Sequence, residues 1–276
     1  MSPFAAATVC ITGGTGSLGH ALTRLLLGKP IRALRIVSRD EVKQFGMRQE
    51  FPDSRMRFLI GDVRSAARME RAFDGADIVI HAAAMKRIES CEYNPDEAVA
   101  TNIDGARAVI SAARAVGVPR VMAISSDKAA APETLYGGTK FVAERLFVRA
   151  NEDPKPTRFA VCRYGNVTAS RGSFVPILME QRKAGVVTVT DPRCTRFWMT
   201  LGDAAAFVLD KVERMSGGEL FVPKLPAYAV TDLIAAVAPG CEVKVTGTRG
   251  DEKLHEAMIS LTESRRTESL ADYFVV

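Results

Sequence analysis

The chain has 276 residues, of which 47% are hydrophobic and 25% are charged, and these proportions fit a globular protein and exclude a disordered one. Its formal net charge is +5, and the basic residues are too dispersed to form an arm for nucleic acid. The five cysteines lie far apart, without a Cys-x-x-Cys pair or a Cys/His cluster, so we expect neither a disulfide framework nor a metal site.

No apolar run in the sequence approaches the roughly 18 residues that a membrane-spanning helix needs. The first residues lack the charged region of a signal peptide and lead directly into a predicted strand. We therefore expect a cytoplasmic protein that contacts neither membrane nor nucleic acid.

Strands and helices are predicted to alternate through the first part of the chain. The predicted strands span residues 7–12, 33–38, 56–62, 76–84, 120–127 and 157–167. The predicted helices span residues 17–29, 40–51, 65–73, about 90 to 116, and 136–151. Strands this apolar are covered on both faces, so the pattern predicts an α/β fold with a doubly wound parallel sheet.

Beyond residue 167 this alternation loosens, and shorter strands and helices predict a smaller C-terminal α/β lobe. We expect a large domain over residues 1–167 and a mainly substrate-binding lobe over 168–276, with the chain free to interleave between the two. No repeat or Pro/Ser-rich linker separates them, so the lobes should pack as one unit.

The stretch "TGGTGSLG" (12–19) joins the first predicted strand to the first helix. Small residues let the backbone approach a pyrophosphate, and the helix N-terminus supplies N–H donors. At this position the glycine pattern predicts a Rossmann-like dinucleotide site in the large domain. Its expected cofactor contacts are Gly13, Thr15, Gly16, Ser17, Leu18 and Gly19.

The tip of the second strand bears on which dinucleotide is bound. Ser38 and Arg39 offer a hydroxyl and a guanidinium, which suit the 2′-phosphate of NADP. Asp40 follows them, and a carboxylate near this tip is what NAD would need. Asp62 could contact the adenine amino group, or it could be a solvated loop residue or a helix cap. Further expected cofactor contacts are Lys43, Asp62, Val63, Ala82, Ala83 and Ala84.

Tyr136 and Lys140 lie one helical turn apart on the same face of a predicted helix. A lysine ammonium favours the phenolate and should bring the tyrosine pKa toward neutrality. Such a tyrosine can remove a hydroxyl proton while hydride leaves the same carbon for a nicotinamide. Ser125 and Ser126 close the preceding strand and join the expected catalytic set.

The glycine loop with Ser and Tyr-x-x-x-Lys resembles the extended short-chain dehydrogenase/reductase superfamily, which includes sugar-nucleotide epimerases, dehydratases and decarboxylases. Asp127 and Lys128, directly after Ser126, narrow the choice. An epimerase needs only the tyrosine system, because hydride leaves and returns at C4. A 4,6-dehydratase must also remove the C5 proton and expel the 6-hydroxyl as water, which takes an adjacent base and acid.

The motifs "HAAAMKRI", "SSDKA", "LYGGTK", "TRFWMT" and "DEKLHEAMIS" are similar to those of the inverting UDP-N-acetylglucosamine 4,6-dehydratases of polysaccharide biosynthesis, and the resemblance covers almost the whole chain. It implies bound NADP, a UDP-sugar substrate, C4 oxidation by Tyr136 with Lys140 and Ser125, and elimination by Lys128 as base and Asp127 as acid. It also implies a homo-oligomer. Ser126 and Gly138 depart from the family's usual threonine and alanine.

The resemblance also implies where the substrate binds. Arg196 and Arg249 would hold the diphosphate and Glu252 the ribose, while Asn166 and Lys86 follow predicted strands and could face the sugar. Alternative functions stay open: a UDP-hexosamine 4-epimerase, a dehydratase that stops at the 5,6-unsaturated sugar, or a non-catalytic NADP-binding regulator.

Overall fold

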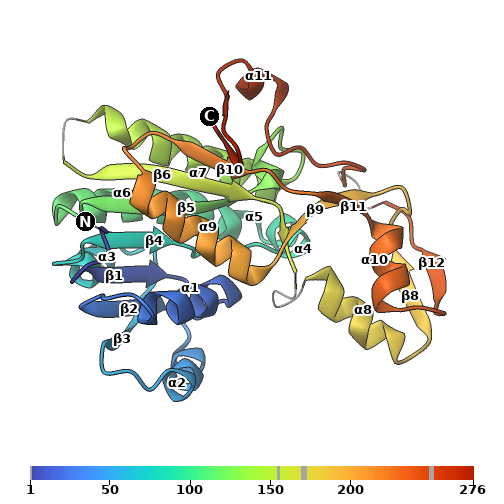
Figure 1. Ribbon diagram of the computed structural model, residues 1–276, viewed down its shortest axis with the longest axis horizontal. Helices are drawn as coiled ribbons and strands as arrows, with labels where there is room; N and C mark the ends of the chain where they lie inside the picture. Colours follow the sequence, from blue (N-terminus) through green and yellow to red (C-terminus); the bar gives the residue numbers. More distant parts are fainter. Residues whose placement is uncertain (1, 154–155, 169–172, 249–251) are drawn as a thin grey trace.

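The structure is a computed structural model that describes residues 2–153, 156–168, 173–248 and 252–276. Two lobes are visible in Figure 1, a large one built on a long sheet and a small one beside it. No helix in the described ranges combines the length and the apolar character that a membrane crossing requires.

The large sheet confirms the predicted α/β class. Its strand order is β13-β14-β10-β6-β5-β4-β1-β2-β3, and all pairs are parallel except those of β14 with β10 and β13. The strands are β1 (Thr8–Thr12), β2 (Ala33–Ser38), β3 (Met56–Ile60), β4 (Ile78–His81), β5 (Arg120–Ser126), β6 (Arg158–Tyr164), β10 (Leu220–Pro223), β13 (Glu268–Ser269) and β14 (Tyr273–Val275). The order reverses between β1 and β4, and ligands of such sheets bind at the carboxyl ends of the strands near that point.

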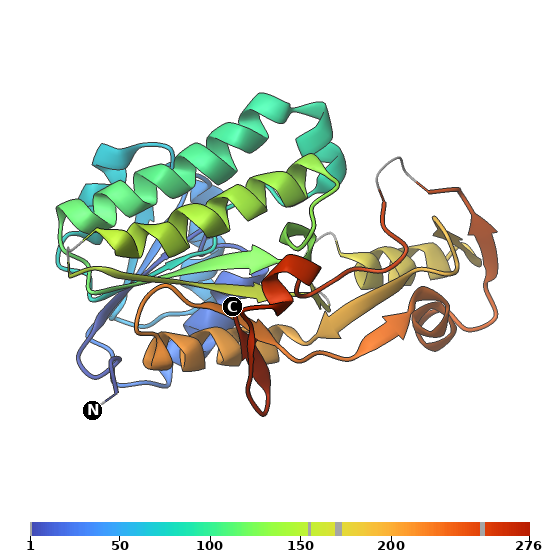
Figure 2. The same cartoon turned by 90° about the horizontal axis from the view of Figure 1, so that it is seen from above.

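Helices cover both faces of this sheet (Figure 2). Alternate strand residues supply the two cores: Val9 and Ile11 of β1 belong to one, and Cys10 between them belongs to the other. The first core lies under α1 and α9, and the second under α3, α6 and α7. These helices are α1 (Ser17–Leu27), α3 (Ala66–Phe73), α6 (Gly105–Ala115), α7 (Leu135–Arg149) and α9 (Leu201–Arg214), and α2 (Glu41–Glu50) follows β2.

The helical stretch predicted from about 90 to 116 is present, but Asn94 interrupts it. The segment comprises α4 (Ile88–Tyr93), α5 (Pro95–Val99), a π-helical turn over Ala100–Asp104, and α6. Asn94, before Pro95, has φ −127° and ψ 68°, because a residue that precedes proline is sterically disfavoured in the helical region. The apolar periodicity continued across this break and concealed it.

Two predicted strands also end early. The strand predicted over 76–84 stops at His81, so the three alanines after it lie in a loop. The strand predicted over 157–167 divides into β6 and β7 (Asn166–Val167). At Gly165, between them, a Cβ would lie 2.6 Å from the Phe197 Cβ. Glycine is therefore required where the chain turns from the large sheet to the small lobe.

The small lobe has its own core around Leu178, Val187 and Ile234. It contains two small sheets, of order β11-β9-β7 and β12-β8. Its elements are α8 (Phe174–Arg182), β8 (Val186–Val189), β9 (Thr195–Met199), β11 (Ala227–Ala229), α10 (Val230–Val237) and β12 (Glu242–Val245), together with β7.

The chain crosses between the lobes several times after Val167. It enters the small lobe at β7, returns to the large sheet with α9 and β10, and enters the small lobe again at β11. It then returns through residues 252–264, which we call the strap and which end in α11 (Leu261–Ser264), and finishes in β13 and β14 (Figures 1 and 2). The boundary expected at residue 167 thus marks only the first of these crossings.

Candidate active site

The glycine loop lies between β1 and α1, as predicted, at the carboxyl edge of the sheet. Gly13 has φ +66°, and a Cβ there would lie 2.7 Å from the Ala83 backbone. A Cβ on Gly19 would overlap the carbonyl oxygen of Gly14. These positions let β1, α1 and the loop after β4 approach one another closely, which is the geometry of a dinucleotide pyrophosphate site.

The residues expected to select the cofactor gather where β2 ends, but each has a protein partner. The buried Ser38 accepts a hydrogen bond from Gln44 Nε2 through its Oγ, at 3.0 Å. Arg39 is more than half exposed and lies 3.8 Å from the Asp62 carboxylate. Lys43 pairs with Asp40 at 2.7 Å.

Asp40 caps α2, because its Oδ1 accepts a hydrogen bond from the Lys43 backbone at 2.9 Å. A carboxylate engaged in this way is a poor ribose acceptor. Asp62, expected at the adenine, is 2.7 Å from the Arg64 guanidinium. The other expected contacts are placed as follows: Val63 is buried after β3, and Ala82, Ala83 and Ala84 are half-buried after β4.

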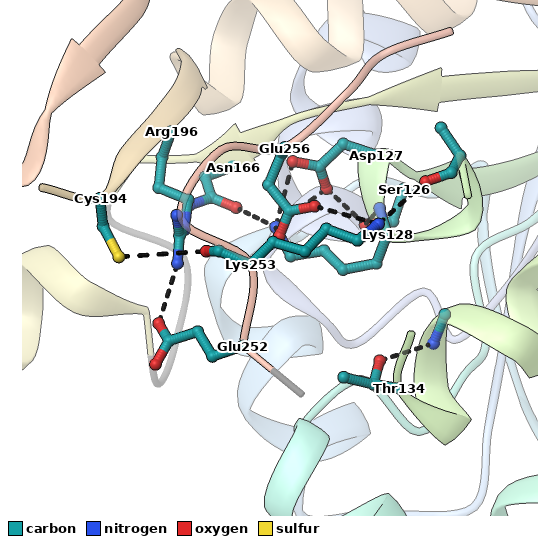
Figure 3. Close-up of polar contacts among 12 residues, drawn as sticks. Ser126, Asp127, Lys128, Thr134, Asn166, Cys194, Arg196, Glu252, Lys253 and Glu256 are labelled. Carbon is teal, nitrogen blue, oxygen red and sulfur yellow. Dashed lines mark hydrogen bonds and ion pairs between the residues drawn. The ribbon is translucent and has the colours of Figure 1, made fainter. Parts of the chain in front are cut away.

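Tyr136 and Lys140 are both buried on α7. The helix begins at Thr134, whose Oγ1 accepts a hydrogen bond from the Gly137 N–H at 3.1 Å (Figure 3). A Cβ on Gly137 would overlap the Lys128 carbonyl, so this glycine brings α7 against the short helix Asp127–Ala129 (η2). The neighbouring Gly138 has open space around it, and the family's usual alanine would fit there.

Burial controls the ionisation of this pair. It raises the pKa of Tyr136 above its ordinary value, although a hydrogen bond with Ser126 acts in the opposite direction. It lowers the pKa of Lys140 to about 8, and Lys140 Nζ donates to the Ile124 carbonyl at 2.6 Å. The expectation that Lys140 brings the pKa of the phenol toward neutrality is therefore wrong for the chain by itself, because desolvation of the phenolate dominates.

Asp127 and Lys128 lie on η2, directly after β5. Lys128 Nζ is 3.0 and 3.1 Å from the two Asp127 carboxylate oxygens and 3.1 Å from the Asn166 Oδ1. It is also 3.3 Å from the Glu256 Oε1 (Figure 3). Three segments of the chain, η2, β7 and the strap, thus meet at one ammonium group.

Ser126 joins the two reactive pairs. Its Oγ donates to Asp127 Oδ1 at 2.9 Å, and the same residue acts on Tyr136 by lowering the pKa of the phenol against the effect of burial. Ser125 is buried one residue earlier, and within the described part of the chain its hydroxyl has no hydrogen-bond partner. The predicted catalytic residues are therefore adjacent in space.

Some of the expected substrate residues lie together between β7, β9 and the strap, and the others lie elsewhere or outside the described residues. Arg196 lies where β9 meets the strap, and its guanidinium contacts the Glu252 carboxylate at 2.8 Å (Figure 3). It also donates to the Leu254 carbonyl at 3.0 Å. Asn166 lies on the neighbouring strand β7. Lys86 is exposed in the loop after β4, and Arg249 lies outside the described residues.

Sequence reasoning missed the roles of Lys253 and Glu256. Lys253 Nζ donates to the Ala130 carbonyl at 3.1 Å and also to that of Ala131. Glu256 contacts Lys128 with a side chain that is only 6% exposed. The motif "DEKLHEAMIS" contains both residues, but no local spacing connects them with η2, and only the tertiary fold reveals the contacts.

The fold and the site together define an enzyme of the extended short-chain dehydrogenase/reductase class. The sequence profile of the family described as "Polysaccharide biosynthesis protein" matches residues 9–276, and the chain belongs to this family. A protein of Campylobacter jejuni named UDP-N-acetylglucosamine 4,6-dehydratase (inverting) is 48% identical over 274 residues, which cover 97% of this chain and 82% of that protein.

Other similar proteins carry different names. A Rickettsia conorii protein named UDP-glucose 4-epimerase is 41% identical over 97% of this chain and 82% of its own length. The X-ray structure of Pen from Bacillus thuringiensis has a TM-score of 0.96 at 37% identity, over 99% of this chain and 90% of that one. A dTDP-glucose 4,6-dehydratase from Streptomyces venezuelae, solved with NAD and TYD bound, shares the fold at 19% identity with a TM-score of 0.81, over 94% of this chain and 89% of that one.

Proposed function

We propose that the chain is a UDP-N-acetylglucosamine 4,6-dehydratase that inverts C5. The observation that carries this proposal is the position of Asp127 and Lys128, an acid and an amine in contact at 3.0 Å and linked through Ser126 to Tyr136. The name of the 48% identical relative agrees with it. Oxidation at C4 alone would not require the second pair.

The cofactor that we propose is a nicotinamide dinucleotide, and specifically NADP. A Cβ at Gly13 or Gly19 would overlap main-chain atoms of Ala83 or Gly14, and such close approach of backbone segments in the glycine loop supports a pyrophosphate site there. Arg39 and Lys43 lie near the expected 2′-phosphate, while Asp40 is engaged as a helix cap. When bound, the oxidised cofactor supplies a positively charged hydride acceptor.

The two pairs divide the reaction between them. Tyr136 in its phenolate form, supported by Lys140 and Ser125, takes the proton of the 4-hydroxyl while hydride leaves C4. The resulting ketone acidifies C5–H, and neutral Lys128 takes that proton while its electron pair forms the C5–C6 double bond. The C6–O bond breaks, and the oxygen leaves as water with the proton of Asp127. Hydride then returns to C6, and a proton is added to C5 from the opposite face, so that the double bond is saturated and the dinucleotide would be restored to its oxidised form.

Substrate and cofactor would bind to different parts of the molecule. The large lobe would hold the dinucleotide and both reactive pairs. The UDP-sugar would be held by Arg196, Arg249, Glu252, Asn166 and Lys86. Cys10, Cys91, Cys162 and Cys194 are buried and unpaired, which supports a reducing cytoplasmic location. Phe141 and Val142, each more than a third exposed on α7, support a homo-oligomer.

A 4-epimerase is the second candidate, and the name of the Rickettsia conorii relative favours it. Incubation with UDP-N-acetylglucosamine in D₂O, followed by mass spectrometry and NMR, separates the two. A dehydratase yields a product lighter by one water with deuterium at C5, because a base that exchanges with solvent has acted there. An epimerase loses no water and leaves C5 protonated. That second result with every UDP-hexosamine offered would overturn the dehydratase proposal.

A further inference from the structure

Glu256 brings a second carboxylate to the site of elimination. Its side chain is 6% exposed, and its Oε1 lies 3.3 Å from Lys128 Nζ (Figure 3). Its Oε2 is buried, and no hydrogen-bond partner for it exists among the described residues. Leaving a buried carboxylate oxygen without a hydrogen bond destabilises a fold, and two ammonium groups offset this cost, Lys128 at Oε1 and Lys253 at 4.0 Å from Oε2.

The ammonium of Lys128 has three hydrogens and three neighbouring acceptors, which are Asp127, Asn166 and Glu256. During elimination Lys128 gains a positive charge as it takes the C5 proton. Asp127 is then a neutral acid, and it becomes an anion only as its proton leaves with the 6-oxygen. Asn166 carries no charge. Glu256 is therefore the contacting carboxylate that stays negative throughout the step.

The strap holds Glu256 in place from both sides. Before it, Lys253 binds the carbonyls of Ala130 and Ala131, next to η2. After it, the buried Arg163 donates to the Met258 carbonyl at 3.0 Å and pairs with Glu263 at 2.8 Å. A charge fixed in advance by such anchors stabilises a developing charge without reorganisation.

We propose that Glu256 is a positioning residue of the elimination step, which holds Lys128 beside Asp127 and stabilises the positive charge that Lys128 acquires. This inference rests on the proposed dehydratase function. It does not concern C4 oxidation, because the contacts of Glu256 are with Lys128 and, at 4.0 Å, Lys253.

Glu256→Gln tests the inference because it keeps the size of the side chain and removes the charge. We expect water loss and C5 deuterium exchange to fall roughly 10- to 100-fold, because the Lys128–Glu256 ion pair is nearly buried and a buried charged contact is of that size. Reduction of bound NADP by substrate, KM and the unfolding midpoint should stay near native values. Glu256→Asp keeps the charge and should recover part of the elimination rate, while the exposed Glu268→Gln on β13 is the matched control.

The comparison of the two half-reactions gives a readout that a structural role would not change. Among the described residues, the charged groups that face Lys128 are Asp127 on η2 and Glu256 on the strap, with Lys253 behind Glu256. Because Glu256 contacts the elimination pair, Glu256→Gln should slow water loss and C5 exchange while the reduction of NADP by substrate keeps its native rate.

The outcomes separate the inference about Glu256 from the proposed dehydratase function. If the native enzyme removes water and Glu256→Gln does so equally fast, this inference is overturned and the dehydratase function stands. If the substitution slows C4 oxidation and elimination by the same factor, Glu256 is merely structural and the inference is overturned. If the native enzyme removes no water from any UDP-hexosamine, the proposed function fails and the inference falls with it.

Discussion

The two reactive pairs lie next to each other but are controlled by different forces. Tyr136 and Lys140 come from one helix, are both buried, and shift in pKa chiefly because burial disfavours their charged forms. Lys128 instead sits among acceptors from three segments of the chain. A pair that lies on one buried helix can be encoded within four residues, whereas a pair held by contacts from several segments depends on the whole fold. Substitutions should therefore separate the two pairs.

The largest effect is expected at the redox pair. Tyr136→Phe removes the phenolic proton acceptor with little change in shape, so turnover should fall roughly 10²- to 10⁴-fold, the usual contribution of a positioned base. Both C4 oxidation and water loss should be lost, because the second needs the ketone made by the first. Single-turnover assays with UDP-N-acetylglucosamine measure both, and substrate binding by calorimetry should persist.

Tyr93→Phe is a suitable control, since Tyr93 is exposed on α4 and should tolerate the same change. Near-native turnover of Tyr136→Phe would show that the tyrosine is not the base and would contradict the division of labour between the two pairs.

The complementary effect is expected at the elimination pair. Lys128→Ala should reduce water loss and C5 exchange by a similar factor while substrate still reduces bound NADP, because Lys128 acts only once the ketone exists. Absorbance of the reduced nicotinamide and deuterium at C5 report the two steps separately. Lys183→Ala, at an exposed position on the small lobe, is the matched control. Retained C5 exchange in Lys128→Ala would assign the base to another residue.

The difference between the pairs also explains what the sequence could and could not predict. The parallel sheet, the glycine loop and the Tyr-Lys pair depend on local periodicity and spacing, and all three are present in the structure. The break before Pro95 was missed because apolar periodicity ran through it. The contact between Glu256 and Lys128 could not be predicted, because it forms only after the strap returns from the small lobe.

A third prediction follows from the burial of Lys140. Its pKa is about 8 in the folded chain, against 10.5 for an ordinary lysine, so between these values the unfolded state binds more protons than the folded state. The free energy of unfolding should therefore rise with pH across this window, by up to about 3 kcal/mol from this group. Below pH 8 the cost of burying the charge is fully present.

Urea denaturation of the native chain and of Lys140→Met, without cofactor, from pH 7 to pH 10.5 isolates this contribution, because the other titrating groups are common to both proteins. The difference in unfolding free energy should move in favour of the native chain as pH rises. A difference that stays constant over the window would show that Lys140 is not tuned by desolvation.

The smallest effect is expected where β2 ends, at the residues that we expect to select the cofactor, because the charged side chains there are partly exposed to solvent. Arg39 is more than half exposed and only 3.8 Å from its partner Asp62, so solvent screens its contribution and a 2′-phosphate contact there is weaker than a buried one. Arg39→Ala should reduce the preference for NADP over NAD by about tenfold, or about 1.4 kcal/mol, as measured by titration of each cofactor. Arg57→Ala, at the opposite end of the neighbouring strand β3, controls for the loss of a positive charge. If the native chain binds both cofactors equally, the proposal of NADP is contradicted, and Ser38, Arg39 and Lys43 serve the fold alone. If Arg39→Ala abolishes NADP binding altogether, this guanidinium contributes as much as a buried group, and the contrast between screened and desolvated charges fails at this site.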